Sequence, residues 1–216
     1  MSWLLDRLIA VERKARELAK EWIRRASYAR TAARLKGVRS YSYTTDYVSA
    51  HQAGWGSHLA DLAGRPDVRC LEIGSYEGRS AVWFLQHVLT HPTATLTCVD
   101  PNALPRFQHN LRIAGAGDKV RHVQRRSEEV LASLPEERFD VIYVDGSHRA
   151  LNVLFDAVAS TRLLKRGGIL ILDDYLWEPD RPVADRPQMA IDLFLDSFRT
   201  RFEVLEQGYQ VILKKR

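Results

Sequence analysis

The sequence has no apolar stretch approaching the roughly 18 residues that a membrane-spanning helix needs. Its N-terminus is rich in charged residues, which argues against a secretory signal peptide. We therefore expect a cytoplasmic protein with no membrane among its partners. Cysteine is also scarce: Cys70 and Cys98 lie in separate apolar runs and lack the close spacing of a metal site. Free buried thiols are the expected state of both residues.

Acidic residues are scarce in the N-terminal part of the chain. The net charge is +5, but residues 1–40 contain 11 Lys/Arg and only 4 Asp/Glu, whereas the remainder contains 21 Lys/Arg and 23 Asp/Glu. The basic character therefore belongs to an N-terminal arm. Such an arm is typical of a solvated helix face, and less often of contact with nucleic acid or another anionic surface.

The N-terminal arm has a helical pattern. Its apolar residues recur at alternating steps of four and three, namely Leu4, Leu8, Val11, Ala15, Leu18 and Trp22. This spacing predicts a helix, which Gly37 ends, with one apolar side. Because three heptads are short for a coiled coil, we expect this side to dock on the rest of the protein or on a partner subunit, and a homo-oligomer is one alternative. A second helix is predicted over residues 44–63.

From residue 67 onward, short apolar runs alternate with helical patterns. The predicted strands are 68–73, 95–100, 120–124, 139–145 and 168–172, followed by a hairpin of 202–205 and 209–213 around a turn at 206–208. The predicted helices are 80–90, 105–114, 149–164 and 187–198, with a further helix capped by Ser127. This alternation indicates βαβ units. We predict an α/β fold, a doubly wound, mostly parallel seven-stranded sheet with a C-terminal antiparallel hairpin. Residues 67–216 would form this domain, and residues 1–66 an N-terminal helical arm and cap.

A glycine turn follows the first predicted strand and opens the next helix. Its sequence is Leu71-Glu72-Ile73-Gly74-Ser75-Tyr76-Glu77-Gly78-Arg79-Ser80. Glycines allow a sharp turn and a close approach to a ligand, and ligands bind at the carboxyl ends of strands in such sheets. The next strand ends in Asp100, which can accept hydrogen bonds from ribose hydroxyls. An ordinary tight turn is the alternative.

The glycine spacing disfavours a nicotinamide dinucleotide. No glycine stands at position 76, where a pyrophosphate would need close approach. The acids Glu72 and Glu77 instead suit a cation, such as the sulfonium of S-adenosylmethionine.

Three further acids follow predicted strands. Asp145 ends the fourth strand, and Asp173 and Asp174 end the fifth, so all three are expected at one edge of the sheet. Carboxylates that converge repel one another unless a cation joins them, and oxygen ligands favour Mg²⁺, Ca²⁺ or Mn²⁺. Such an ion could lower the pKa of a substrate hydroxyl, and a neutral His148 nearby could remove its proton. The alternatives are a polar residue at a helix start for His148 and a capped loop for Asp173 and Asp174.

Segments 71–80, 139–148 and 167–177, together with Asp100, resemble class I S-adenosylmethionine-dependent methyltransferases of Rossmann-like fold. The turn from Gly74 to Gly78 is similar to that of metal-dependent catechol and caffeoyl-coenzyme A O-methyltransferases. The run Asp145-Gly146-Ser147-His148 is closer to macrolide-sugar O-methyltransferases. Asp174 departs from the catechol group, which has asparagine there.

The resemblance implies roles for individual residues. S-adenosylmethionine would be held by Glu72, Gly74, Ser75, Tyr76, Gly78, Ser80, Asp100, Ser127 and Asp145. A divalent cation, Mg²⁺ before others, would be held by Asp145, Asp173 and Asp174, and His148 would be the catalytic base. Aromatic residues could line the acceptor pocket or pack in the core, and these are Tyr41, Tyr43, His51, Trp55 and Trp177.

We therefore expect metal-assisted O-methylation of a small-molecule hydroxyl, on a sugar or an aromatic natural product. One alternative is an RNA methyltransferase that uses the basic arm, although nucleic acid is not the favoured partner. Another is an assembly module that keeps the fold without catalysis.

Overall fold

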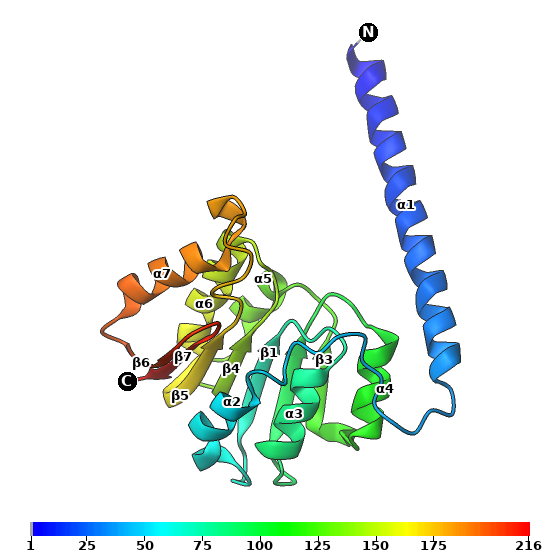
Figure 1. Ribbon diagram of the computed structural model, residues 1–216. Helices are drawn as coiled ribbons and strands as arrows, with labels where there is room; N and C mark the ends of the chain where they lie inside the picture. Colours follow the sequence, from blue (N-terminus) through cyan, green and yellow to red (C-terminus); the bar gives the residue numbers. More distant parts are fainter. Residues whose placement is uncertain (1) are drawn as a thin grey trace.

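The computed structural model describes residues 2–216, with side chains for residue 7 and residues 9–216. Its seven strands form one sheet in the order β3-β2-β1-β4-β5-β7-β6 (Figure 1). The strands are β1 (Arg69–Ile73), β2 (Thr95–Val99), β3 (Val120–Val123), β4 (Phe139–Val144), β5 (Leu164–Leu172), β6 (Phe202–Gln207) and β7 (Val211–Lys215). Strands β1 to β5 pair in parallel, and β7 joins β5 and β6 in antiparallel pairing. The predicted α/β fold with its antiparallel hairpin is therefore confirmed.

Helices cover both faces of the sheet. They are α1 (Ser2–Leu35), α2 (Gln52–His58), α3 (Arg79–His87), α4 (Pro105–Ile113), α5 (Ser127–Val130), α6 (Ala150–Leu163) and α7 (Pro187–Phe198). Short 3₁₀ turns lie at Ala60–Leu62, Gly117–Lys119, Leu131–Ser133 and Val183–Asp185. Side chains of α2, α3 and α4 belong to one buried cluster, and those of α6 and α7 to a second. The sheet thus has a hydrophobic core on each side.

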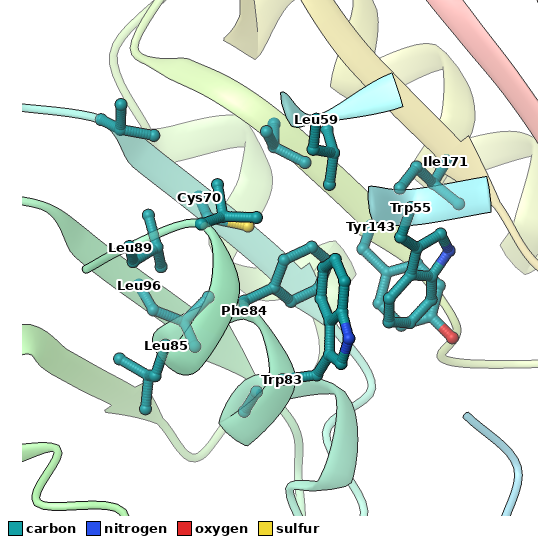
Figure 2. Packing of buried hydrophobic residues seen from close by; sticks show 14 of the residues in the cluster. Trp55, Leu59, Cys70, Trp83, Phe84, Leu85, Leu89, Leu96, Tyr143 and Ile171 are labelled. Carbon is teal, nitrogen blue, oxygen red and sulfur yellow. The ribbon is translucent and has the colours of Figure 1, made fainter. Parts of the chain in front are cut away.

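Alternation along the central strands separates the two cores. In β4, Val141 and Tyr143 belong to the cluster with α2 and α3, whereas Ile142 and Val144 belong to the other. Figure 2 shows Trp55 and Tyr143 packed together in the first cluster. Trp55 is fully buried and stacks on Phe84 with ring centroids 5.2 Å apart. This packing ties the segment before β1 to the sheet.

Helix α1 projects from the domain and lies beside α4 only at its C-terminal end (Figure 1). Leu35 is buried there, but Val11, Leu18 and Trp22 are exposed. The expectation that the apolar side docks on the rest of the protein is therefore wrong for these residues, because they lie beyond the reach of the domain. The side chains of Leu4 and Leu8 lie outside the described residues.

The predicted helix over residues 44–63 is too long. Only Gln52–His58 is α-helical, with a 3₁₀ turn at Ala60–Leu62. The backbone N–H of Thr44 donates to Glu77, and the carboxylate of Asp46 accepts from the N–H groups of Val48 and Ser49. These bonds replace the i to i−4 bonds that a helix would need.

Three smaller expectations also need correction. Ser127 is the first residue of α5 rather than its cap, and its hydroxyl bonds to Glu128. Strand β5 begins at Leu164, because Leu164 pairs with Phe139 before an irregularity in the ladder. The hairpin turn follows Gln207 instead of spanning 206–208, because a register shift lets β6 keep pairing with β7 up to that residue.

Candidate active site

The carboxyl ends of the parallel strands meet at one edge of the sheet. The backbone N–H of Asp145 donates to the carbonyl of Ile73 at 2.8 Å, and that of Asp173 to the carbonyl of Val144 at 3.0 Å. These bonds continue the ladders one residue beyond β1, β4 and β5. The turn that begins at Gly74 therefore lies beside both acids.

The glycine turn requires glycine at two positions. Gly74 has φ +85°, and a Cβ there would lie 1.9 Å from the carbonyl oxygen of Asp145. Gly78 has φ +77°, and its Cβ would lie 2.9 Å from the ring of Phe107. The first glycine allows β1 and β4 to approach closely at the strand ends, and the second starts α3.

Asp100 holds the glycine turn in place. Its Oδ2 accepts the backbone N–H groups of Ser75 at 2.9 Å and Tyr76 at 3.1 Å, and its Oδ1 accepts that of Asn102 at 2.7 Å. A carboxylate has about four lone-pair sites, so acceptor capacity remains for a ribose. The structure thus gives Asp100 a positioning role that sequence reasoning missed.

The two acids of the turn face protein groups. Glu72 is fully buried and accepts hydrogen bonds from Ser80 and from the thiol of Cys98, and burial raises its pKa. Glu77 accepts from Thr44 and lies 3.4 Å from Arg106. Both carboxylates, which we expected to suit a sulfonium cation, are therefore bonded to protein groups instead.

A strap formed by residues 40–47 crosses the turn. The backbone N–H of Thr44 and its hydroxyl donate to Glu77 at 2.6 and 3.0 Å. The buried side chain of Asn110 bonds to the backbone N–H and carbonyl of Ser42, at 2.8 and 3.0 Å. Tyr76, 52% exposed and at φ +43°, places its hydroxyl 3.2 Å from that of Thr44. Sequence reasoning missed the strap, because its contacts join distant segments.

The hydroxyl of Ser75 is a further feature of the turn. It is buried and has no hydrogen-bond partner among the described residues. A buried hydroxyl without a partner is costly in a folded protein. A polar ligand at the turn would supply one, which fits a cofactor with an amino-acid end. Ser127, predicted near the adenine, is partly exposed after β3.

The structure brings three ligand-type side chains together. Single atoms of Asp145, His148 and Asp174 lie within 4.8 Å of one another. Asp174 Oδ2 lies 2.7 Å from Nε2 of His148, and Asp174 has φ +62°. This limit of 4.8 Å is slightly larger than the distance of about 4.2 Å between two opposite ligand atoms around Mg²⁺. The donor set suits a divalent cation after a small adjustment.

Asp173 is held differently from the other two acids. Its Oδ2 accepts hydrogen bonds from the hydroxyl of Tyr143 and from the amide of Gln210, and its Oδ1 from the backbone N–H of Asp174. The indole N–H of Trp55 donates to the side-chain oxygen Oε1 of Gln210 at 2.7 Å, and this bond orients the side-chain amide of Gln210. Asp173 is therefore fixed next to the three-residue group and is not itself part of it.

Charge repulsion marks this cluster. Burial raises the pKa of Asp145 well above its ordinary value, and Asp173 and Asp174 raise it further. Burial and Asp174 likewise raise the pKa of Asp173. The hydrogen bond that His148 donates to Asp174 raises the pKa of His148. A bound cation would favour the ionised carboxylates and relieve this repulsion.

Aromatic side chains surround the cluster. Trp177 stacks on His148 with ring centroids 4.3 Å apart. The guanidinium of Arg181 lies over the Trp177 ring. His51 stacks against Tyr209, whose hydroxyl donates to Asp174. These rings therefore lie next to the acids.

Three of the aromatic residues considered for the acceptor pocket have contacts with other parts of the protein. Trp55 is a core residue and Tyr41 bonds to Gln86 on α3. Tyr43 lies under the guanidinium of Arg79. Sequence reasoning missed Tyr143, Tyr209 and Gln210. Tyr143 carried a usable signal, since it is a polar side chain two residues before Asp145 in an apolar strand.

Asp156 is a buried acid outside this cluster. It is 1% exposed, its Oδ1 has no partner among the described residues, and burial raises its pKa to about 7. A Cβ on Gly146 would lie 3.8 Å from its Oδ2, so it lies under the loop after β4. The stability that protonated Asp156 provides should be lost as pH rises from about 4 to about 7.

Replacing Asp156 with asparagine should remove this pH dependence. The unfolding free energy of the variant should exceed that of the unchanged protein at pH 8, by a margin on the order of 4 kcal/mol, and the margin should shrink toward pH 4. Urea denaturation at several pH values measures it. Asp196→Asn on exposed α7 is the matched control, with an expected effect within about 0.5 kcal/mol at each pH. Parallel pH profiles for the unchanged protein and Asp156→Asn would contradict the assignment.

Known proteins match this domain. A family model described as "Methyltransferase domain" matches residues 71–175, almost half of the chain. A catechol O-methyltransferase of Mycobacterium tuberculosis is 29% identical over 130 residues, covering 60% of this chain and 57% of that protein. The chain spans about half to three fifths of the length of the curated relatives it matches.

Solved structures share the fold. An O-methyltransferase from Bacillus cereus in complex with SAH superposes with a TM-score of 0.63 at 15% identity, covering 88% of this chain and 91% of that chain. MycE methyltransferase from the mycinamycin biosynthetic pathway, in complex with Mg and SAH, gives a TM-score of 0.59 at 16% identity, covering 79% and 51%. Residues 71–175 therefore match a methyltransferase domain, and the sheet has the fold of these solved methyltransferases.

Proposed function

We propose that this protein transfers the methyl group of S-adenosylmethionine to a hydroxyl of a small molecule, with the help of a divalent cation. The observation that carries the proposal is the convergence of Asp145, His148 and Asp174 within 4.8 Å, beside the glycine turn. An oxygen-rich group with an imidazole is suited to hold a cation and to move a proton.

The donor would lie along the glycine turn. Gly74 and Gly78 give the turn its left-handed backbone and its close contacts with Asp145 and Phe107, and Ser75 offers a hydroxyl without a partner among the described residues. Asp100 fixes the turn through two backbone bonds and keeps capacity for the ribose. Glu72, Tyr76 and Ser127 are proposed to help shape this pocket.

The transfer is a displacement in which the acceptor oxygen forms a bond to the methyl carbon. The carbon–sulfur bond breaks, and its electron pair stays on sulfur, which leaves as a neutral thioether. The hydroxyl proton goes to His148. Because Nε2 of His148 faces Asp174 at 2.7 Å, the remaining ring nitrogen, Nδ1, is the proposed acceptor. Asp174 orients the ring and stabilises the imidazolium that forms.

Asp145 and Asp174 would hold the cation, with His148 at its side and Asp173 next to it. When bound, a divalent cation lowers the pKa of a coordinated hydroxyl. Asp173 keeps its orientation through Tyr143 and Gln210. Trp177 stacks on one face of the His148 ring and would help to hold it in this orientation.

The acceptor is proposed to be a ring-shaped phenol or sugar. Trp177, His51 and Tyr209 present aromatic faces next to the acids, and such faces stack on flat or apolar ring surfaces. MycE has been solved with mycinamycin VI, a small-molecule partner of that protein. An RNA acceptor is the second candidate, and only the basic arm favours it.

Replacing Asp174 with glycine tests the cation directly. Glycine tolerates the left-handed φ of +62° without strain, so the variant removes the carboxylate and its bonds to His148 and Tyr209 without distorting the backbone. We expect at least about tenfold weaker Mg²⁺ binding and a similar loss of methyl transfer, with SAH affinity unchanged. Calorimetry with Mg²⁺ and SAH, and transfer of labelled methyl groups to phenols, sugars and RNA, give the readouts.

Asp174→Asn is the matched control, because it keeps an oxygen ligand and also tolerates this backbone. It should retain Mg²⁺ binding. If methyl transfer by the unchanged protein, Asp174→Gly and Asp174→Asn all resisted a chelator, the cation would be ruled out. If SAH gave no heat in calorimetry, the cofactor would be ruled out.

A further inference from the structure

Helix α1 exposes an unusual amount of apolar surface. Trp22 is 72% exposed, Val11 66% and Leu18 63%. Scattered exposed apolar residues are ordinary, but these three share one side of a helix that projects from the domain (Figure 1). Between them, Ala15 continues the same side. The apolar stripe of α1 is therefore Val11, Ala15, Leu18 and Trp22.

The heptad pattern of the stripe ends after Trp22. The next step of three residues reaches Arg25, whose guanidinium pairs with Glu21 at 2.8 Å. A charged residue in the seam disfavours a longer coiled coil. With 3.6 residues per turn, the stripe of a straight helix instead continues through Ala26, Ala29 and Ala33. A straight amphipathic helix therefore suits this sequence better than a supercoiled pair.

The rest of the helix surface is positively charged. The ion pairs of α1 use the acids Glu12, Glu17 and Glu21. Lys14, Arg30 and Arg34 form no ion pair with any acid among the described residues. Residues 41–216 hold more acids than bases. The domain that these residues form lies beside only the C-terminal end of α1 (Figure 1).

Basic residues also border the apolar stripe. Lys14 lies three residues after Val11 and four before Leu18, and Arg25 lies three after Trp22. Residues at these spacings are neighbours on a helix surface. A second copy of this helix would cover the stripe but would leave Lys14, Arg30 and Arg34 without an anionic partner of their own on α1. A nucleic acid would satisfy the bases but would leave Leu18 and Trp22 in water.

We propose that α1 binds an anionic lipid surface, lying in its plane with the apolar stripe inserted among the headgroups. A helix that combines a tryptophan-containing apolar side with many Lys and Arg residues matches such a surface in both charge and hydrophobicity. Among the described residues, no helix is long and apolar enough to cross a membrane, so the contact is peripheral. This proposal replaces the expectation of no membrane partner, which rested on the lack of a span.

Co-sedimentation of the full chain with vesicles tests the proposal. We expect binding to vesicles of phosphatidylcholine with phosphatidylglycerol, at least about tenfold weaker binding to phosphatidylcholine alone, and loss of binding at high salt. Charge reversal by Lys14→Glu with Arg25→Glu should weaken the anionic binding by about tenfold or more.

A matched pair of variants tests the apolar stripe. Leu18→Ser should weaken vesicle binding several-fold, whereas Ile9→Ser should not, since Ile9 is also exposed but lies roughly opposite the stripe on the helix. SAH binding should be the same in both variants. Dimers in sedimentation equilibrium without lipid, or salt-sensitive binding to RNA without vesicle binding, would overturn the proposal.

Discussion

Replacing Gly74 with alanine is expected to destabilise the protein by at least about 3 kcal/mol and to abolish SAH binding. A Cβ at this position would lie 1.9 Å from the carbonyl oxygen of Asp145 and 2.5 Å from its carbonyl carbon. The φ of +85° adds strain for any L side chain. Since backbone atoms cannot rotate away, the strand ends must separate, and Asp145 must move with them. Urea denaturation and calorimetry with SAH measure the two effects.

Gly56→Ala is the matched control for this change. Gly56 lies in α2, where a Cβ would meet nothing within 4 Å and the backbone is not left-handed. The same substitution there should stabilise the protein by about 0.5–1 kcal/mol. An unchanged denaturation midpoint and normal SAH affinity in Gly74→Ala would refute the close approach of β1 and β4.

Replacing His148 with alanine is expected to lower kcat by about 10²–10⁴-fold, the usual contribution of a general base. His148 is partly exposed, bonded to Asp174 and stacked on Trp177. It lies on the loop after β4 and outside both hydrophobic cores, so its removal should leave the fold and SAH affinity intact. Single-turnover methyl transfer and SAH calorimetry separate the two outcomes.

His91→Ala is a suitable control, because the side chain of His91 bonds to nearby Thr93 in the loop before β2, outside the acid cluster. It should leave kcat unchanged. If His148→Ala lost turnover and SAH affinity in equal measure, His148 would be a structural residue of the cofactor pocket rather than the base.

Local patterns were sufficient to predict the sheet and its glycine turn. Short apolar runs alternate with amphipathic helices, and strands of this kind pair in parallel. Asp100, Asp145 and Asp173 each follow such a run, so their placement at one edge follows from topology alone. Gly74 stands where the chain must turn sharply, and its positive φ agrees with that expectation.

Contacts between distant segments could not be predicted in this way. Segment 44–51 has an ordinary helical pattern, but Thr44 donates two hydrogen bonds to Glu77, and these bonds hold the segment in a non-helical path. Asp173 and Asp174 are adjacent and chemically identical, yet Gln210 orients the first and His148 pairs with the second. No local pattern distinguishes these two acids, because the difference depends on residues from β7 and from the loop after β4.

The sequence alone determined the succession of strands and helices along the chain, the glycine turn, and the set of acids that follow the strands. These properties depend on short-range periodicity and on the geometry of parallel strands, which every such sheet shares. The tertiary structure decided which acid pairs with His148, which one is held by Tyr143 and Gln210, and how far α1 stands from the domain. Those outcomes depend on side-chain packing across the sheet, where a few tenths of an ångström and the burial of charge select among similar residues.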